Sequence, residues 1–180
     1  MIELALHVLD IAENSSRAMA TLVEIDIIED TKMDVLSMEI RDNGQGMDEK
    51  TLERAMDPFF TTKKVRRIGL GLPMLAQAAD AAEGMFFIES EPGRGTRVFV
   101  KFRHSHIDRQ PIGDMAGSVT ALILGNPDID IVYVHKKDGL TYSLDTRDIR
   151  SGIGDIPLNH REVLDMIRNN LDDGIKELNG

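Results

Sequence analysis

A single carboxylate followed by two glycines is the first feature of this sequence that suits ligand recognition. Asp42 follows residues 36–40, whose alternating apolar and polar side chains indicate a strand, and Gly44 and Gly46 come directly after it. A carboxylate at a strand end can accept a hydrogen bond from the exocyclic amine of adenine, and glycines let the backbone approach a flat base. Met47 is placed to pack on one face of the ring. The same spacing also suits a solvated turn, because such junctions collect Asp, Asn and Gly for backbone reasons.

Two polar residues share one face of a predicted helix at residues 2–18. Asp10 and Asn14 are four residues apart, which makes them neighbours on a helix surface. The Asn14 carbonyl is a hard oxygen ligand of the kind that Mg²⁺ takes together with nucleotide phosphates and water. Asp10 is suited to accept a hydrogen bond from a water that attacks a γ-phosphate, or to orient a metal-bound water. Arg17, one turn further on, suits a phosphate or a neighbouring acid. Such a pair is also common as a solvated surface feature.

A glycine-containing turn opens a second long predicted helix, at residues 70–82. The turn consists of Gly69, Leu70, Gly71 and Leu72. The free N–H groups of a helix N-terminus bind anions, and glycines let that backbone reach phosphates. Four basic residues lie just upstream, namely Lys63, Lys64, Arg66 and Arg67. Between an adenine-reading acid and a phosphate-binding turn they predict a mobile lid that screens phosphate charge, with an ordinary solvated loop as the alternative.

Taken in order, these motifs resemble the GHKL superfamily of ATP-binding domains, which includes gyrase B, heat-shock chaperones of this fold, histidine kinases and MutL. Residues 9–18 resemble the N box, and their Glu-Asn-Ser run is especially like the MutL form. Residues 42–47 resemble the first glycine box, and residues 57–63 are similar to the F box of histidine kinases. Residues 69–72 resemble the second glycine box, and residues 89–96 the final hairpin of the kinase type.

The resemblance covers roughly residues 2–103 and implies binding of ATP with Mg²⁺. It implies that Asn14 binds Mg²⁺, that Asp42 binds the adenine amine, and that Thr96 helps to fix the base, with a water as one route. It leaves Asp10 as the candidate catalytic residue. The other predicted nucleotide-binding residues are Arg17, Gly44, Gly46, Met47, Phe60, Thr62, Lys63, Gly69, Leu70, Gly71 and Leu72.

Three features depart from the family's pattern. Asp10 stands where ATPase members carry a Glu general base and many kinases carry Asn or Glu, so the shorter side chain leaves hydrolysis open. Arg67 takes the place of the first glycine in the usual Gly-x-Gly-Leu-Gly-Leu pattern, and the lid between Phe60 and Gly69 is short. No dimerisation and phosphoacceptor domain precedes the N box in this sequence, so we expect any phosphoacceptor to act in trans.

The expected fold is an α/β (α+β) two-layer sandwich of the Bergerat ATP-binding type, with a mixed or mainly antiparallel sheet and helices on one face. Residues 1–103 are predicted to form the ATP-binding domain, with helices at 2–18, 48–56 and 70–82 and strands at 23–28, 35–41, 85–90 and 96–103. Residues 104–117 are predicted to be a linker. Residues 118–180 are predicted to form a small C-terminal extension, with strands at 119–124, 131–135 and 140–144, a loop at 145–157, and a helix from a capping box at 159–162 to about 178.

The role of residues 118–180 stays open at this level. They could extend the same sheet, form a homodimer, or receive a protein partner. The apolar face of the last predicted helix does not discriminate among these roles.

Bulk properties exclude several classes of function. The 180-residue chain carries a formal net charge of −10, which argues against a broad surface for nucleic acid and against anionic membranes. It contains no cysteine, which excludes disulfides, thiolate nucleophiles and zinc–thiolate sites. No apolar run reaches the length of a membrane span and no secretory signal is evident, so the expected location is the cytoplasm.

Three functions remain open, and they differ in the fate of the γ-phosphate. The first is a signalling kinase module that transfers phosphate in trans to His or to Ser/Thr of a partner. His104 and His106 are possible acceptors within the chain, although histidines in a polar linker are more often exposed filler. The second is an ATPase-type switch of the MutL or gyrase kind, in which nucleotide orders the lid. The third is a non-catalytic regulatory binder, as in anti-sigma relatives.

Overall fold

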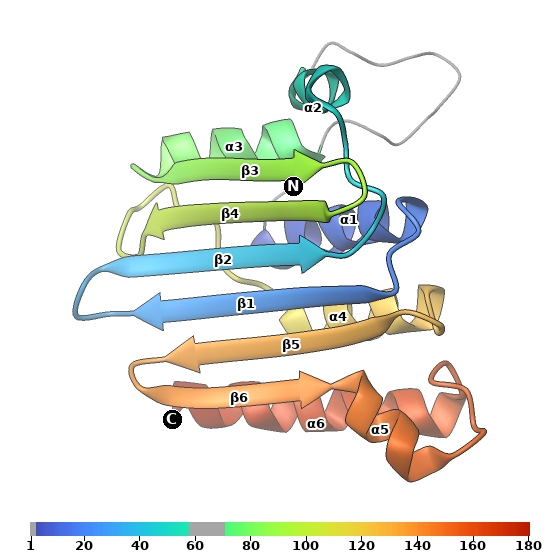
Figure 1. The fold of residues 1–180 in the computed structure, drawn as a ribbon. Coiled ribbons are helices and arrows are strands. Elements are labelled where there is room, and N and C mark those ends of the chain that lie inside the picture. The colour runs from blue at the N-terminus through green and yellow to red at the C-terminus, as the bar shows by residue number, and fades with distance from the viewer. Residues whose placement is uncertain (1–2, 58–70) are drawn as a thin grey trace.

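The computed structural model describes residues 3–57 and 71–180, which form helices packed on one sheet (Figure 1). The helices are α1 (Leu4–Arg17), α2 (Glu49–Met56), α3 (Gly71–Ala81), α4 (Met115–Gly125), α5 (Thr146–Ile153) and α6 (Arg161–Asn179). The strands are β1 (Leu22–Asp30), β2 (Val35–Asp42), β3 (Met85–Glu91), β4 (Gly95–Arg103), β5 (Asp130–Lys137) and β6 (Leu140–Asp145).

The six strands form a single mixed sheet in the order β3-β4-β2-β1-β5-β6. β1 and β5 run parallel, and the other neighbouring strands run antiparallel. α1, α3, α4 and α6 all lie behind the sheet in Figure 1, and the opposite face is turned toward the viewer. The predicted fold class, a two-layer α/β sandwich with helices on one face, is therefore confirmed.

The alternation of side chains along the strands explains why one face of the sheet carries the core. In β1, Val23, Ile25 and Ile27 are at most 1% exposed and face the helices. The intervening Glu24 and Asp26 lie on the other face. Each buried side chain of this size contributes about 1.5–3 kcal/mol by leaving water, so a shift of one residue in register would reverse a large favourable term.

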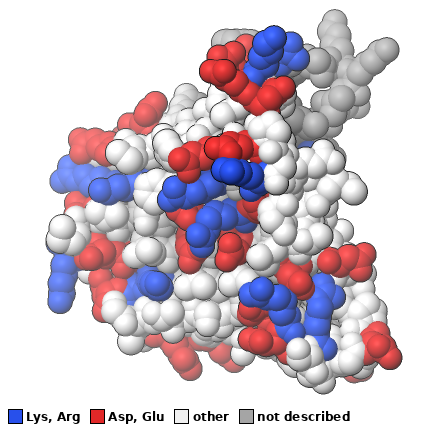
Figure 2. Space-filling model, in the orientation of Figure 1, with Lys and Arg blue, Asp and Glu red and all other residues white. Residues whose placement is uncertain are grey.

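The open face of the sheet is covered by charges of both signs (Figure 2). Arg97 pairs with Glu39 at 2.7 Å across β4 and β2, and Arg41 pairs with Asp26 at 3.2 Å across β2 and β1. These cross-strand ion pairs let the face remain in water without a covering layer of helices.

Residues beyond β4 continue the same sheet and the same core. β5 pairs with β1 along its whole length, with Ile25 opposite Tyr133. The connection from β4 to α4 runs past the start of α1, whose Leu4 and Ala5 N–H groups donate to the carbonyls of Pro111 and Ile112. The sequence leaves three roles open for residues 118–180. The structure shows the first of them, because β5 and β6 extend the sheet formed by the earlier strands.

Three local predictions in this C-terminal region are wrong. Residues 119–124 belong to helix α4 and not to a strand. The buried residues of α4 lie on one face, but the opposite side carries Gly117, Ala121 and Leu124 instead of charged residues, so the run lacks the helical periodicity that would have identified it. The helix is capped by Asp114, whose carboxylate accepts from the Gly117 N–H at 2.8 Å. The predicted capping box at 159–162 is also absent, because the N-cap residue of α6, His160, makes no side-chain cap bond.

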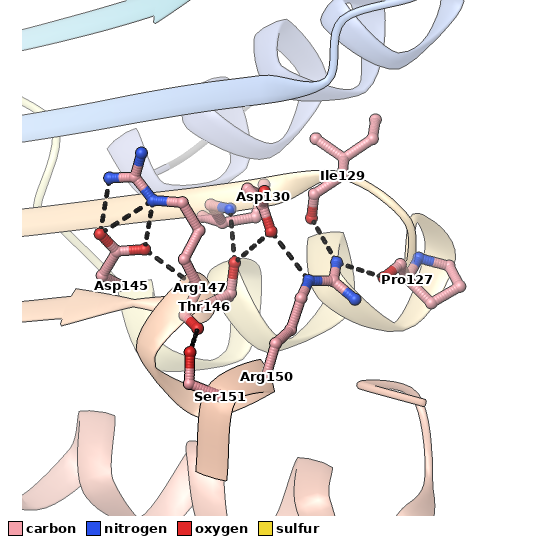
Figure 3. A network of polar contacts seen from close by, with 9 residues as sticks. Pro127, Ile129, Asp130, Asp145, Thr146, Arg147, Arg150 and Ser151 are labelled. Atoms are coloured by element: carbon pink, nitrogen blue, oxygen red, sulfur yellow. Dashed lines mark hydrogen bonds and ion pairs between the residues drawn. The ribbon is translucent and has the colours of Figure 1, made fainter. Parts of the chain in front are cut away.

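The predicted loop at 145–157 contains helix α5, which a polar network anchors to the sheet (Figure 3). Asp145 caps the helix and also pairs with Arg147. The buried hydroxyl of Thr146 accepts from the Ile131 N–H at 2.8 Å, and Arg150 donates to Asp130 at 2.8 Å. The contacts of Thr146 and Arg150 join residues 15 and 20 positions apart, which a local reading of turn residues cannot detect.

Candidate nucleotide-binding site

A cavity of about 400 Å³ lies at the ends of β2 and β4, between these strands and helices α1, α2 and α3. Ile11, Ile40, Val98 and Leu72 supply apolar walls, and the polar lining residues include Asp42. This size and this mixture of a mainly apolar wall with a few polar groups are typical of small-molecule sites.

Asp42 is held at the cavity by two hydrogen bonds. Its Oδ2 accepts from the Ser15 hydroxyl at 2.7 Å, and its Oδ1 accepts from the Gly44 N–H at 2.8 Å. A carboxylate has about four lone-pair positions, so each oxygen keeps the capacity to accept from a ligand. Asp42 thus presents a fixed hydrogen-bond acceptor to the cavity, which is what recognition of an amine requires.

Thr96 lies directly opposite Asp42 because β2 and β4 pair in this register. Its hydroxyl is 2.8 Å from Ser90 Oγ, which in turn donates to the Gly95 carbonyl at 3.0 Å and accepts from the Met47 N–H at 2.8 Å. Ser90 has a single proton, so when that proton is given to Gly95 the Thr96 hydroxyl must donate to Ser90. Thr96 then offers acceptor lone pairs to the cavity.

The two glycines in the turn after Asp42 have different structural roles. Gly46 lines the cavity and has φ +66°, and a Cβ there would strike the Glu91 carbonyl. Gly44 is outside the lining, and a Cβ there would press on the Ala18 carbonyl at 2.7 Å. Gly44 therefore allows the turn to pack on the end of α1, which is a different role from the predicted clearance for the base.

Asn14 and Arg17 both line the cavity, with Arg17 Nη1 donating to Asn14 Oδ1 at 3.1 Å. The amide oxygen keeps a second lone pair and is a hard donor, so Asn14 fits a Mg²⁺ ligand. Within residues 3–57 and 71–180 no three His, Cys, Asp or Glu side chains are grouped to hold a metal ion. A Mg²⁺ ion would then take its other ligands from phosphates and water, as this ion commonly does.

Asp10 is in a different position from the other predicted site residues. It is not one of the residues that line the cavity, whereas Gly71 and Leu72 are. A Cβ added at Gly71 would collide with the Asp10 carboxylate, so that carboxylate lies against the start of α3. Met47 lines the cavity. Five other predicted site residues lie outside the described part of the chain, namely Phe60, Thr62, Lys63, Gly69 and Leu70.

Sequence reasoning missed Ser15 and Ser90, which orient Asp42 and Thr96. Ser15 is 2% exposed and lies one turn after Ile11 on the inner face of α1. A hydroxyl on the buried face of an otherwise apolar helix needs a partner, and that signal is present in the sequence. Its partner, 27 residues away, is visible only in the fold.

His104 and His106 lie at the opposite end of β4 from Thr96. With about 3.3 Å per residue, the nine residues of β4 separate the two ends by roughly 25 Å or more. These two possible acceptors are therefore remote from the cavity of their own chain.

His104 belongs to a buried polar network that we call the far-end network, formed by Glu29, His104, His135 and Tyr133. The Glu29 oxygens accept from His135 at 2.9 Å and from His104 at 3.0 Å, and the Tyr133 hydroxyl is 3.0 Å from His135 Nδ1. Burial alone would raise the pKa of Glu29, but the hydrogen bonds from His135 and His104 outweigh it and lower this pKa to about 2. Burial also raises the pKa of Tyr133.

Comparison with known proteins agrees with this geometry. The model of the histidine kinase-, DNA gyrase B-, and HSP90-like ATPase family matches residues 2–106. The sensor protein kinase FleS of Pseudomonas aeruginosa is 39% identical over 89 residues, which cover 49% of this chain and 22% of FleS. The sensor kinase CckA of Brucella abortus is 31% identical over 110 residues, which cover 53% of this chain and 12% of CckA. The matched region is thus a small part of either kinase.

The fold as a whole has a counterpart among solved structures. The N-terminal domain of a DNA repair protein superposes with a TM-score of 0.56 over 86% of this chain and 58% of that chain, at 18% identity. At this identity the likeness concerns the fold alone. In the described part of the chain, no helix is both long and apolar enough to cross a membrane.

Proposed function

Because this chain belongs to the histidine kinase-, DNA gyrase B- and HSP90-like ATPase family, we propose that its cavity at the ends of β2 and β4 binds ATP with Mg²⁺. The observation that carries the proposal is the Asp42 carboxylate, fixed by Ser15 and by the Gly44 N–H and aimed into a mainly apolar cavity. An adenine ring suits the apolar walls, and its exocyclic amine suits the acceptor.

The other lining residues supply the remaining parts of such a site. Asn14 would hold Mg²⁺, which when bound offsets the negative charge of the phosphates. Gly71 and Leu72 are the first described residues of α3 and line the cavity. The N–H groups at a helix N-terminus favour an anion such as a phosphate. Thr96, with its proton engaged by Ser90, would accept from the base or from a water beside it.

We further propose that the γ-phosphate passes to a protein partner. Two observations support this step. His104 and His106 are about a strand length away from the cavity, and the His104 ring is engaged by Glu29. The matched relatives FleS and CckA are named as kinases, and this chain aligns with a small part of each.

A non-catalytic regulatory binder is the second candidate, and one observation favours it. The Asp10 carboxylate lies against Gly71 and outside the cavity lining, so Asp42 is the only acidic side chain among the described residues 3–57 and 71–180 that lines the cavity. An ATPase switch would need Asp10 to reach an attacking water.

Incubation with γ-labelled ATP and Mg²⁺ separates these functions. Label on a co-purified protein supports phosphotransfer, labelled phosphate in solution supports an ATPase switch, and tight binding with neither supports the regulatory binder. Asn14→Ala should abolish the Mg²⁺-dependent part of the binding. Asn169→Ala, at an exposed position on α6, is the matched control and should leave binding unchanged. Unchanged binding in Asn14→Ala would contradict the assignment of the metal ligand.

A further inference from the structure

Asp10 and Gly71 share one space between α1 and α3. An ideal Cβ built on Gly71 would fall on the Asp10 carboxylate and would lie 3.1 Å from its Cγ. Gly71 is buried, and Asp10 is partly buried. The carboxylate therefore occupies the volume that a side chain at position 71 would need, and it lies against the backbone of the first described residue of α3.

Gly71 and Asp10 differ in whether they line the cavity. Gly71 and Leu72 line the cavity, and so does Asn14, one helical turn after Asp10. Asp10 itself does not line it. A general base must come within about 2.6–3.2 Å of the water that it activates in the complex with substrate. The observed carboxylate instead faces the first described turn of α3, where the helix dipole favours a negative charge.

From this geometry we propose that Asp10 is a positioning residue, which fixes the first turn of α3 for the phosphates and does not activate the attacking water. The proposal rests on the proposed function, because it assigns the phosphate-binding part of the same site. Packing against Gly71 fixes how far the α3 backbone stands from α1, and thereby where the Gly71 and Leu72 N–H groups meet a phosphate tail. A larger residue at position 71 would have to displace the Asp10 carboxylate, because that carboxylate occupies the space of the added Cβ.

A double-mutant cycle tests the shared space. Gly71→Ala should weaken ATP binding by about fivefold to tenfold, because the added methyl displaces the Asp10 carboxylate from the first turn. Adding Asp10→Ala removes the obstacle, so the double variant should bind ATP within about threefold of Asp10→Ala alone. Losses that simply add would overturn the proposal. Gly152→Ala is the matched control, since a Cβ there meets nothing within 4 Å.

The dependence on ligand separates positioning from a purely structural role. Asp10→Ala should lower the affinity for ATP and ADP by about fivefold to tenfold while leaving adenosine binding unchanged, because only the phosphates contact α3. Any phosphate release, measured per bound ATP, should stay within about twofold of the parent protein. Equal losses for all three ligands, or lost turnover at unchanged ATP affinity, would overturn the proposal, the latter because it is the signature of a general base.

Failure of the proposed function would be recognised separately. If the parent protein does not bind ATP, that function fails, and the same cycle can be followed through urea unfolding. Non-additive changes in the free energy of unfolding would still support contact between Asp10 and Gly71, and additive changes would contradict it.

Discussion

The two ends of the central sheet both contain a buried or partly buried carboxylate, but the carboxylates differ in what remains free to bind. At the cavity end, Asp42 accepts from Ser15 and from the Gly44 N–H, and it lines a cavity of about 400 Å³. In the far-end network, both Glu29 oxygens accept from histidine rings, and the Glu29 side chain is 8% exposed. A carboxylate at a strand end is therefore a ligand site only where its surroundings leave an acceptor facing open space.

The comparison predicts that substitutions at the two ends change different measurements. Those in the far-end network should change the free energy of unfolding and leave nucleotide affinity alone. Those at the cavity should do the opposite. The predictions below test that separation, in order of decreasing expected effect.

Glu29→Ala should give the largest effect, a loss of about 3 kcal/mol in the free energy of unfolding. The substitution removes the acceptor of two buried or partly buried histidine rings, and breaking one partner of a buried charged cluster typically costs about 3–5 kcal/mol. Urea denaturation measures the loss, and ATP affinity should stay within about twofold. Glu162→Ala, at an exposed position in the first turn of α6, should lose at most about 1 kcal/mol, from the helix dipole. A parallel loss of ATP affinity in Glu29→Ala would contradict the separation.

The same carboxylate predicts a pH dependence of stability. Its pKa is about 2 in the folded protein and 4.5 in its ordinary state, so the stabilisation is complete above pH 4.5 and is lost as the pH falls toward 2. The difference between these pKa values corresponds to roughly 3 kcal/mol. Unfolding curves at a series of pH values, for the parent and for Glu29→Gln, isolate this contribution. Equal slopes between pH 4.5 and 2 would show that Glu29 is not its source.

Ser15→Ala should weaken ATP binding by about fivefold to tenfold. It removes the hydroxyl that fixes Asp42 Oδ2, and a hydrogen bond to a charged group is worth about 1.5 kcal/mol or somewhat less when the site is partly exposed. Titration calorimetry measures the change. Ser16→Ala, the next residue and absent from the cavity lining, is the matched control. Equal affinity in the two variants would remove Ser15 from the site.

Thr96→Val should have the smallest effect, a loss of about threefold in ATP affinity. Valine keeps the β-branched shape of threonine but removes the oxygen that faces the cavity. Thr141→Val, at an exposed position on β6, should not change the affinity. A loss as large as that of Ser15→Ala would mean that Thr96 binds the base as directly as Asp42 does.

Much of this fold and site could be predicted because the signals are local. β1 and β2 alternate regularly, and the run from Asp42 to Met47 combines a carboxylate with glycines that the turn requires. Asp42, Asn14 and Thr96 line one cavity, as expected for residues of one site.

The predictions that failed depend on burial or on distant contacts. The outward side of α4 carries apolar or small residues such as Ala121 and Leu124, so Val119 and its apolar neighbours show no amphipathic pattern that separates a helix from a buried strand. Helix α5 is anchored through Thr146 and Arg150, whose partners lie on β5 and in the loop before it, 15 to 23 residues away. Ser15 was missed for the same reason, since its partner Asp42 is 27 residues away.

The most direct test of the account is the ATP affinity of Asp42→Asn measured beside that of Glu29→Gln. The asparagine can turn an amide donor toward the adenine amine in place of an acceptor, so Asp42→Asn should lose about thirtyfold or more in affinity with little change in stability. Glu29→Gln should lose stability and keep its affinity. Equal ATP affinities in Asp42→Asn and the parent protein would contradict the central claim that this carboxylate recognises the nucleotide.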